Sequence, residues 1–594
     1  MKAYPREESP GELPSRGFPD GPMEPVWIYP IHNPEWCRAI EREFRIHPIT
    51  AQVLVSRGFE SFAPIHDYLY AKLPHLIPPN QLFDMGVAVD RVIRALKNRE
   101  VVVVYGDNDV DGMTGTALLV EFLRSIGLEV LHSIPIRRST LPKSITDALA
   151  FTLRHKCRLF ITVDCGITAT DEIREYAKRG IDVIVSDHHE PTAKLPDCVA
   201  TLNPKLVNST YPNRELTGVG VAFKLVHALT NHLVSSGMIR SDKIDLKRFL
   251  DLVALGTVAD MGKLIGENRT LVRYGLRQYA QTTRVGLKKL MEICEINPHA
   301  VTTADITSKI APRLNSLGRI ADPSKGVELL LTSDLDRAGA LVTELEANNS
   351  ERKLMEKRDS ESVEKSLLAH PDILQNRAIV LHSRDWHPGI IPIIAARIAK
   401  RYNRPTLIIA VDEGVGKGSG RTIAEFPLLP AFHEYKDLLM NFGGHDYAAG
   451  FLIEEKNIIT FKDAFTKSVN HALKGEEILP KLRLDAGVRL KDLTFDLLDS
   501  LQLLEPYGMG NPQPLLYADV VQSGPARVVG KTHLKFYLQQ DDRLLEGIGF
   551  GLGTHKPDAI HKQAPLRIAF IPHLNIFLNK SSIQLIVKDF KYRK

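Results

Sequence analysis

Residues 101–112 read VVVVYGDNDVDG and decide the fold expected around them. The run 101–105 is short and apolar, as in a strand that is buried on both faces of a sheet. A glycine ends the strand, and three carboxylates follow at alternating positions, Asp107, Asp109 and Asp111. Acids this close repel one another unless a cation lies between them. An all-oxygen cluster favours Mg²⁺ or Mn²⁺ over Zn²⁺, and a solvated acidic loop is the alternative.

Length and composition point to an ordinary globular protein of several domains. The chain has 594 residues, of which 44% are hydrophobic and 25% are charged. A chain of this length is expected to form about three to four domains. A net charge of +5 permits a nucleic-acid partner without arguing for one. The five cysteines form no CxxC pair, so we expect reduced thiols and a cytoplasmic protein.

The hydropathy and the N-terminal sequence predict a protein without a membrane-spanning segment. No stretch approaches the roughly 18 apolar residues of a membrane span. The first 40 residues begin with a segment rich in Pro, Gly and charge and without an apolar core. We therefore expect a disordered extension there, and no signal peptide.

Strands and helices alternate from residue 101 to about 206, which predicts a doubly wound, mostly parallel sheet in an α/β protein. The expected strands read VVVVY, LEVLHSI, RLFITV, DVIVS and CVATLN. Ligands of such sheets bind at the carboxyl ends of the strands. Asp164 follows RLFITV, and Asp187, His188 and His189 follow DVIVS. Each alone also fits a turn or a surface loop, but three such strand ends together predict one site.

A further acid follows an apolar helix. The run LDLVALGTVA ends at Asp260, where a carboxylate opposes the helix dipole. A metal ligand would explain that placement, and an exposed loop acid is the alternative.

The second half of the chain contains a spacer and two further regions. Residues 326–375 are helical and highly charged, and we interpret them as a connecting helix. Residues 376–460 form a second α/β unit with two glycine-rich stretches, GVGKGSGRT (414–422) and NFGGHDYAAGF (441–451). Glycine-rich bends with polar side chains suit phosphate oxygens, although such bends are common.

Residues 461–594 change to short strands and turns, which indicate a small β-barrel. The strand HLKFYL carries Lys535 and aromatic residues, so an OB-fold is the expected barrel. A plain β-sandwich is the rival interpretation.

The motifs GDNDVDG, VDCG, SDHHE and LGTVAD, in this order, resemble motifs I to IV of the DHH phosphoesterase superfamily. The stretches LTGVGVAFKL (216–225), APRLNSLGR (311–319), DWHPGIIPIIAARI (385–398), GGHDYAAG and EPYGMGNPQPLLYADV (505–520) are similar to its RecJ branch. The resemblance covers roughly residues 40–594.

This resemblance implies a domain order and an activity. A DHH domain (41–325), the connecting helix (326–375), a DHHA1 domain (376–460) and an OB-fold domain (461–594) would follow one another, with the catalytic cleft between the DHH and DHHA1 domains. The implied activity is 5′→3′ hydrolysis of single-stranded DNA with two Mn²⁺ or Mg²⁺ ions, in DNA repair and recombination. A single-strand-binding protein and a helicase are the implied partners, and we expect a monomer without membrane contact.

The resemblance also assigns roles to individual residues. Asp164 would bridge the two ions, and His189 would contact the scissile phosphate. The implied metal ligands are Asp107, Asp109, Asp111, Asp164, His188 and Asp260. The implied substrate-binding residues are Arg137, Arg313 or Arg319, Ser419, Arg421, Gly444 and His445.

The chain departs from the family pattern in two places. The stretch IPIRRSTLPKSI (134–145) keeps Arg137 but lacks the usual Gly-Tyr-Gly turn, so the resemblance does not establish how tightly the nearby DNA strand is held. Asn108 stands where an aromatic residue is common.

Two other functions compete with this interpretation. Relatives that cleave short oligonucleotides or cyclic dinucleotides share the metal motifs, but they are shorter and lack the C-terminal barrel. Replication scaffolds related to this superfamily have lost metal ligands, whereas every expected acid and both histidines are present here.

Overall fold

The computed structural model describes residues 24–136, 145–475, 478–530, 532–556, 565–577 and 580–593. These form two compact units. One comprises residues 73–478, and the other combines residues 24–72 with residues 479–593.

The first sheet of the larger unit is entirely parallel, as predicted. Its strand order is β3-β2-β4-β5-β6, so the order reverses at β2, the strand that carries the valine run. The strands are β2 (Val101–Gly106), β3 (Glu129–Ser133), β4 (Leu159–Val163), β5 (Asp182–Ser186) and β6 (Ala200–Leu202). The carboxyl ends of β2, β4 and β5 are adjacent, so the loops after them meet at one edge of the sheet.

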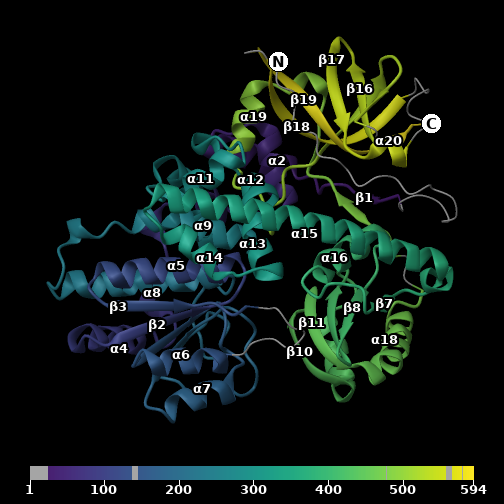
Figure 1. Ribbon diagram of the computed structural model, residues 1–594. Helices are drawn as coiled ribbons and strands as arrows, with labels where there is room; N and C mark the ends of the chain where they lie inside the picture. The colour runs from purple at the N-terminus through teal and green to yellow at the C-terminus, as the bar shows by residue number, and fades with distance from the viewer. Residues whose placement is uncertain are drawn as a thin grey trace. The chain divides into compact units, whose positions relative to one another are not determined.

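Helices cover both faces of this sheet, which explains why β2 has no polar side. Val102 and Val104 pack in a core with α5 (Val110–Ser125) and α8 (Gly218–Ser235). Val103 and Tyr105 pack in a second core with α6 (Leu149–Arg154) and α7 (Thr170–Ala177). Figure 1 shows these two helix pairs on opposite sides of the strands.

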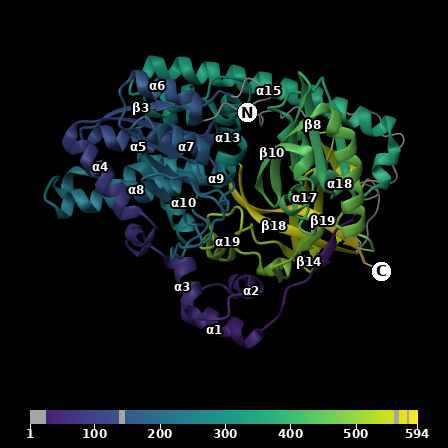
Figure 2. The ribbon, with the colours of Figure 1, turned by 90° about the horizontal axis from the view of Figure 1, so that it is seen from below.

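A helical layer follows the sheet and leads into a long helix. It includes α9 (Leu250–Ala259), α10 (Gly266–Gln278), α11 (Val285–Ile293), α13 (Ala311–Ile320) and α14 (Ser324–Leu331), whereas α4 (Met85–Asn98) precedes the sheet. The long helix, α15 (Leu335–Ala369), is the predicted connecting helix, and Figure 2 shows its full length. No helix in the described part of the chain combines the length and hydropathy needed to cross a bilayer.

The second sheet of this unit is mixed, with strand order β10-β11-β9-β8-β7. Helices α16 (Ile391–Tyr402), α17 (Leu428–Glu434) and α18 (Ile458–Ala472) accompany its strands. The strands are β7 (Ile379–Ser383), β8 (Thr406–Asp412), β9 (Val415–Arg421), β10 (Leu439–His445) and β11 (Ala448–Glu454). The two stretches interpreted as glycine-rich bends are therefore strands: the first is β9, and the second is the β10–β11 hairpin.

Close packing explains the glycines of β9. A Cβ at Gly418 would meet the Phe451 ring at 2.0 Å, and one at Gly416 would meet Ile409 and Ile453 at 2.9 Å. The glycines thus let the sheet approach its apolar layer, and the residues between them point to the other face.

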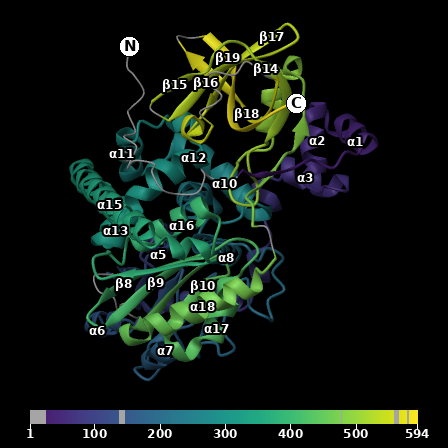
Figure 3. The same ribbon diagram turned by 90° about the vertical axis from the view of Figure 1, so that its right-hand side faces the viewer.

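The smaller unit is a closed barrel with an N-terminal helical segment (Figure 3). Its strand order is β13-β14-β18-β19-β17-β16-β15, and a further pairing of β14 with β16 closes it. The strands are β13 (Ala486–Gly487), β14 (Leu516–Gln522), β15 (Arg527–Val529), β16 (His533–Gln540), β17 (Arg543–Gly549), β18 (Pro565–Phe577) and β19 (Lys580–Tyr592). The expected barrel is therefore present. The strand pairing forms one closed sheet instead of the two separate sheets of a β-sandwich.

Two expected domain limits fall inside structured elements. The first 40 residues, expected to be disordered, include β1 (Val26–Ile28), which pairs with β12 (Lys481–Arg483), and most of α1 (Pro34–Phe44). The expected limit at residue 461 lies within α18, whose phenylalanines pack in the core of the second sheet. Helices α2 (Pro48–Ser56), α3 (Phe62–Tyr70) and α19 (Phe495–Gln502) complete the smaller unit.

Candidate metal centre

The acidic residues that follow the parallel strands lie together at the edge of the sheet. Asp109 caps the N-terminus of α5, and its side chain accepts hydrogen bonds from the backbone N–H groups of Asp111 and Gly112. Asp111 is completely buried and accepts from the N–H groups of Gly218 (2.6 Å) and Val219 (2.9 Å) at the start of α8. Two helix N-termini therefore stabilise the charge of these carboxylates.

Asp164 lies at the end of β4 in the left-handed region, with φ of 62°. Such a conformation is uncommon for a residue other than glycine, although aspartate adopts it more readily than most residues. Gly218 is required beside it, because a Cβ there would lie 2.5 Å from the Cβ of Asp164. Gly256 on α9 is required in the same way, since its Cβ would lie 2.8 Å from Asp111 Oδ1.

The carboxylate and imidazole groups converge on a common space. His188 Nε2 lies 3.0 Å from Asp164 Oδ1, 3.7 Å from Asp260 Oδ2 and 3.9 Å from Asp111 Oδ2. Ligand atoms lie within 4.8 Å of one another in three sets, namely Asp107, Asp109 and Asp164; Asp111, His188 and Asp260; and Asp164, His188 and His189. Asp164 and His188 each belong to two of these sets, and Asp164 is the one that links the acids after β2 to the histidines after β5.

Two buried atoms of this cluster have no hydrogen-bond partner among the described residues. They are Asp164 Oδ1 and His188 Nε2. Each atom is an acceptor when the Asp164 carboxylate is ionised and the proton of the neutral His188 ring lies on Nδ1, and two acceptors cannot satisfy each other. A buried acceptor left without a donor is costly, and a cation placed between the two would satisfy both.

The electrostatics of the cluster agree with a missing positive charge. Burial and the neighbouring Asp109 raise the pKa of Asp111 to about 7. Burial and the charge of Asp111 raise the pKa values of Asp164 and Asp260 well above their usual range. Burial lowers the pKa of His188 well below its usual value, which leaves a neutral imidazole able to bind a metal. The donor set fits a divalent cation, because oxygen ligands with one imidazole suit Mn²⁺ and Mg²⁺.

Asp187 has a supporting position rather than one among the converging ligand atoms. Its carboxylate accepts from the N–H groups of Ile167, His188 and His189, and it contacts His189 Nδ1 at 2.7 Å. Although burial lowers the pKa of His189, the charge and hydrogen bond of Asp187 outweigh it and raise this pKa to about 9. His189 is therefore protonated at neutral pH, and its second N–H remains available for another acceptor.

The β10–β11 hairpin of the second sheet places His445 over these histidines. The rings of His189 and His445 stack, with centroids 5.7 Å apart and an interplanar angle of 14°. Gly444 precedes His445 with φ of 129°, and a Cβ there would lie 2.5 Å from the carbonyl oxygen of Ala448. Glycine at this position therefore allows the turn that brings His445 to the site.

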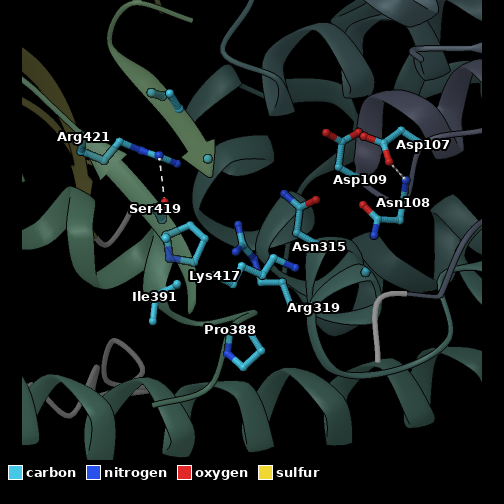
Figure 4. Close-up of a pocket in the computed structure, with 16 residues that line it drawn as sticks. Asp107, Asn108, Asp109, Asn315, Arg319, Pro388, Ile391, Lys417, Ser419 and Arg421 are labelled. Carbon is cyan, nitrogen blue, oxygen red and sulfur yellow. Dashed lines mark hydrogen bonds between the residues drawn. The ribbon is translucent and has the colours of Figure 1, made fainter. Parts of the chain in front are cut away.

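A pocket of about 320 Å³ adjoins the acids. Figure 4 shows Asp107 and Asp109 at one side of it and Ser419 and Arg421 at the other. Between them lie Lys417, Asn315 and Arg319, and Asn108 lies beside Asp107. The pocket thus joins the first sheet, α13 and β9 within the larger unit.

Arg421 is the clearest anion-binding group of the pocket. Its guanidinium donates to Ser419 Oγ at 3.3 Å and to the carbonyl oxygen of Gly420. Burial lowers its pKa, and no carboxylate of the described residues forms an ion pair with it. A half-buried guanidinium beside a hydroxyl is suited to a phosphate group.

The two candidate arginines of α13 have different surroundings. Arg319 lines the pocket, and its Nη1 donates to the carbonyl oxygen of Gly389 at 2.9 Å. Arg313 does not line it; this guanidinium forms an ion pair with Glu346 of α15 at 2.6 Å. Of the pair left open by the resemblance, the structure brings Arg319 alone to the pocket. The other expected arginine, Arg137, lies outside the described residues.

Sequence reasoning missed Lys417 and Asn315. Lys417 was within a stretch expected to be a bend, but as part of β9 it shares a face with Ser419 and Arg421. The alternation of glycine with polar residues was the signal, because a period of two is typical of a strand. Asn315 accepts from the N–H of Val110, which ties α13 to the acidic loop.

Comparisons with known proteins agree along the whole chain. Residues 101–257 match the DHH family, N-terminal domain; residues 375–473 match the DHHA1 domain; and residues 484–589 match the RecJ OB domain. The single-stranded-DNA-specific exonuclease RecJ of Bacillus subtilis (strain 168) is 32% identical over 568 residues, which are 95% of this chain and 70% of that protein. The protein of the same name from Haemophilus influenzae is 33% identical, over 87% of this chain and 92% of its own.

The chain belongs to the RecJ family.

Solved structures of this family identify the metal ions that serve as cofactors. The crystal structure of RecJ from Thermus thermophilus in complex with Mn²⁺ aligns with a TM-score of 0.81 and 30% identity, covering 96% of this chain and 80% of that chain. Its complex with Mg²⁺ aligns with a TM-score of 0.73 and 27% identity, covering 96% and 78%. Divalent Mn²⁺ or Mg²⁺ ions are accordingly the cofactors of this RecJ family member. The doubly wound DHH domain, the DHHA1 domain and the OB-fold expected from the sequence are confirmed.

Proposed function

We propose that this protein is a metal-dependent exonuclease that hydrolyses single-stranded DNA from its 5′ end, in DNA repair and recombination. Membership in the RecJ family supports the substrate and the reaction. One observation of this chain carries the proposal. Two buried polar atoms, Asp164 Oδ1 and His188 Nε2, face each other at 3.0 Å without a hydrogen bond, in the middle of a carboxylate cluster.

We assign the metal ligands as two overlapping sets. Asp107, Asp109 and Asp164 would hold one ion, and Asp111, His188, Asp260 and Asp164 would hold the other. When bound, a pair of divalent ions activates a water molecule and neutralises charge on a phosphate. The protein supplies the rigid frame, because the helix N-termini and the close-packed glycines fix these carboxylates.

His189 is assigned to the scissile phosphate. Asp187 holds its Nδ1–H, so the other ring N–H is directed at an external acceptor. A protonated imidazole stabilises negative charge as it develops on a phosphate oxygen. His445, stacked on this ring, limits its movement, and together with Gly444 it is assigned to substrate binding.

The pocket is assigned to the terminal nucleotide. Ser419 and Arg421 would bind the 5′ phosphate, with Arg319 and Lys417 beside it. A volume of about 320 Å³ is at the lower end of ligand pockets and fits one nucleotide better than a base pair. A single strand whose end is held here presents its first phosphodiester bond to Asp107 and Asp109, which explains both strand specificity and polarity.

Degradation of a long single strand labelled at its 3′ end tests this function. With Mn²⁺ or Mg²⁺ we expect stepwise release of mononucleotides from the 5′ end and retention of the label on the shrinking strand. EDTA is expected to stop the reaction, and a blunt duplex is expected to resist it. Early release of the label would contradict the polarity, and faster cleavage of a dinucleotide than of the long strand would favour the rival substrate.

We also infer partners, an oligomeric state and a location for this protein. A single-strand-binding protein and a helicase are inferred as partners from the family role, together with a monomeric state and a cytoplasmic location. Co-purification with either partner and a sedimentation measurement would test them.

A further inference from the structure

A lysine that the family comparison does not assign lies beside the histidines of the metal centre. Lys205 follows β6, the fifth strand of the parallel sheet, in the segment Asn203–Pro204–Lys205. Asn203 is completely buried; its Nδ2 donates to the carbonyl oxygen of His189 at 2.9 Å, and its Oδ1 accepts from the N–H of Lys205 at 2.8 Å. One asparagine therefore fixes the backbone of Lys205 relative to His189.

The Lys205 ammonium group is held close to the active site by an exposed partner. Its Nζ lies 3.0 Å from Glu190 Oε1, directly after His189 in the sequence. The side chain of Lys205 is only 14% exposed, whereas that of Glu190 is 54% exposed. Burial and then the charge of Lys205 lower the pKa of His445, so the ammonium group is near this histidine as well.

Stability alone gives little reason for this arrangement. An ion pair with a half-exposed carboxylate contributes little to folding, and it costs the freedom of a long side chain. A DNA phosphate is also an anion, and it would replace Glu190 as the partner of the ammonium group without any change in the backbone. Among the residues described, those lining the Arg421 pocket include Asp107 and Asp109 but not Lys205, His189 or His445. Strands β4 and β5 lie between β6 and β2, so Lys205 lies on the β6 side of the metal centre, whereas the pocket adjoins the acids that follow β2.

We propose that Lys205 binds a backbone phosphate of the DNA strand on the side of the metal centre opposite the Arg421 pocket. Glu190 holds the ammonium group in place until that phosphate displaces it. The proposal rests on the proposed function, since it takes single-stranded DNA as the substrate. The 5′ end is held at Arg421, the scissile bond lies at the acids, and Lys205 contacts the part of the strand still to be degraded.

Salt dependence of DNA binding distinguishes a phosphate contact from a structural role. Each phosphate contact to a single strand contributes about 0.7 to the slope of log K against log salt concentration. We would measure this slope by fluorescence anisotropy, with a 3′-labelled, 5′-phosphorylated oligothymidylate and the full-length Asp164→Ala variant, which does not consume the probe. Lys205→Gln in this background is expected to lower the slope by about 0.7 and to weaken binding about tenfold at low salt.

Three further variants complete the experiment. Lys205→Arg keeps the charge and is expected to restore most of the slope. Glu190→Gln removes the competing carboxylate and is expected to bind at least as tightly as its parent. Lys263→Gln, which removes an exposed lysine paired with Glu215, is the matched control and is expected to change neither quantity.

The outcomes separate this proposal from the proposed function. If the chain degrades single strands but Lys205→Gln keeps the full slope, or Glu190→Gln binds more weakly, Lys205 is not a phosphate contact and the proposed function stands. If the chain neither binds nor degrades single strands, both proposals are overturned.

Discussion

At the scale of single residues, the site depends on buried carboxylates whose negative charges repel one another. Asp164 is buried, has a left-handed backbone and leaves one oxygen without a hydrogen bond among the described residues. Its pKa is raised by burial and by Asp111. Strain and repulsion of this kind persist where they serve binding or catalysis, and here they prepare the place of a cation.

Asp164→Ala should abolish the hydrolysis of DNA and the stabilisation of the folded protein by Mn²⁺. The loss of a ligand shared by both ions removes several kcal/mol of transition-state stabilisation, or about a thousandfold in rate. Addition of Mn²⁺ should raise the unfolding temperature of the parent, because the ion binds the folded state. The same addition should raise the unfolding temperature of the variant much less. Asp171→Ala, on an exposed helix of the same domain, serves as the control with parental values. Near-normal cleavage by Asp164→Ala would show that the site is assigned wrongly.

Arg421→Ala should remove the preference for 5′-phosphorylated ends. Hydrogen bonds between charged groups contribute about 1.5–3 kcal/mol, so kcat/KM for a phosphorylated strand should fall roughly ten- to a hundredfold. Cleavage of a 5′-hydroxyl strand should change little. The control is Arg313→Ala, which breaks an ion pair with Glu346 away from the pocket. An unchanged preference in Arg421→Ala, or its loss in Arg313→Ala, would contradict the assignment of the pocket.

At the scale of elements, buried ion pairs hold the helices that carry the acids. Arg284, before α11, contacts Glu121 of α5 and Asp251 of α9, with Nε 3.2 Å from the latter carboxylate. Thr282 Oγ1 donates to the same carboxylate at 2.7 Å. These contacts join the helix that begins at Asp109 to the helix that ends at Asp260, so they fix two sides of the site.

Arg284→Met should destabilise the larger unit by about 3–5 kcal/mol, because it leaves the buried charge of Asp251 without its partner. The unfolding transition of the full chain, followed by calorimetry, should therefore move to lower temperature for this unit. Arg248→Met is the matched control: Arg248 also contacts Glu121, but it is 49% exposed, so its loss should cost less than about 1 kcal/mol. Equal effects of the two substitutions would refute the role given to the buried pair.

Elements with local signals were predictable from the sequence, and contacts between distant elements were not. The valine run and the acids after each strand predict the parallel sheet and the metal centre, because strand ends share one edge. The pocket depends on how β9 faces α13, which no local pattern encodes. Arg313 and Arg319 illustrate this limit: six residues of a helix turn the side chain by about 240°, and only the fold decides which side faces the pocket.

At the scale of the whole molecule, the metal centre and the barrel belong to different units. The larger unit contains both sheets, the acids and the pocket, while the smaller unit is a barrel that matches the RecJ OB domain. Barrels of this class bind single strands through charged and aromatic surfaces. This division suits a long single strand as substrate better than a dinucleotide.

The central claim is that two divalent ions are held by side chains from separate loops at one edge of the parallel sheet. An anomalous-scattering map of crystals soaked in Mn²⁺ tests it most directly. We predict two peaks among Asp107, Asp109, Asp111, Asp164, His188 and Asp260, with Asp164 between them. A map without a peak among these six side chains would contradict the account.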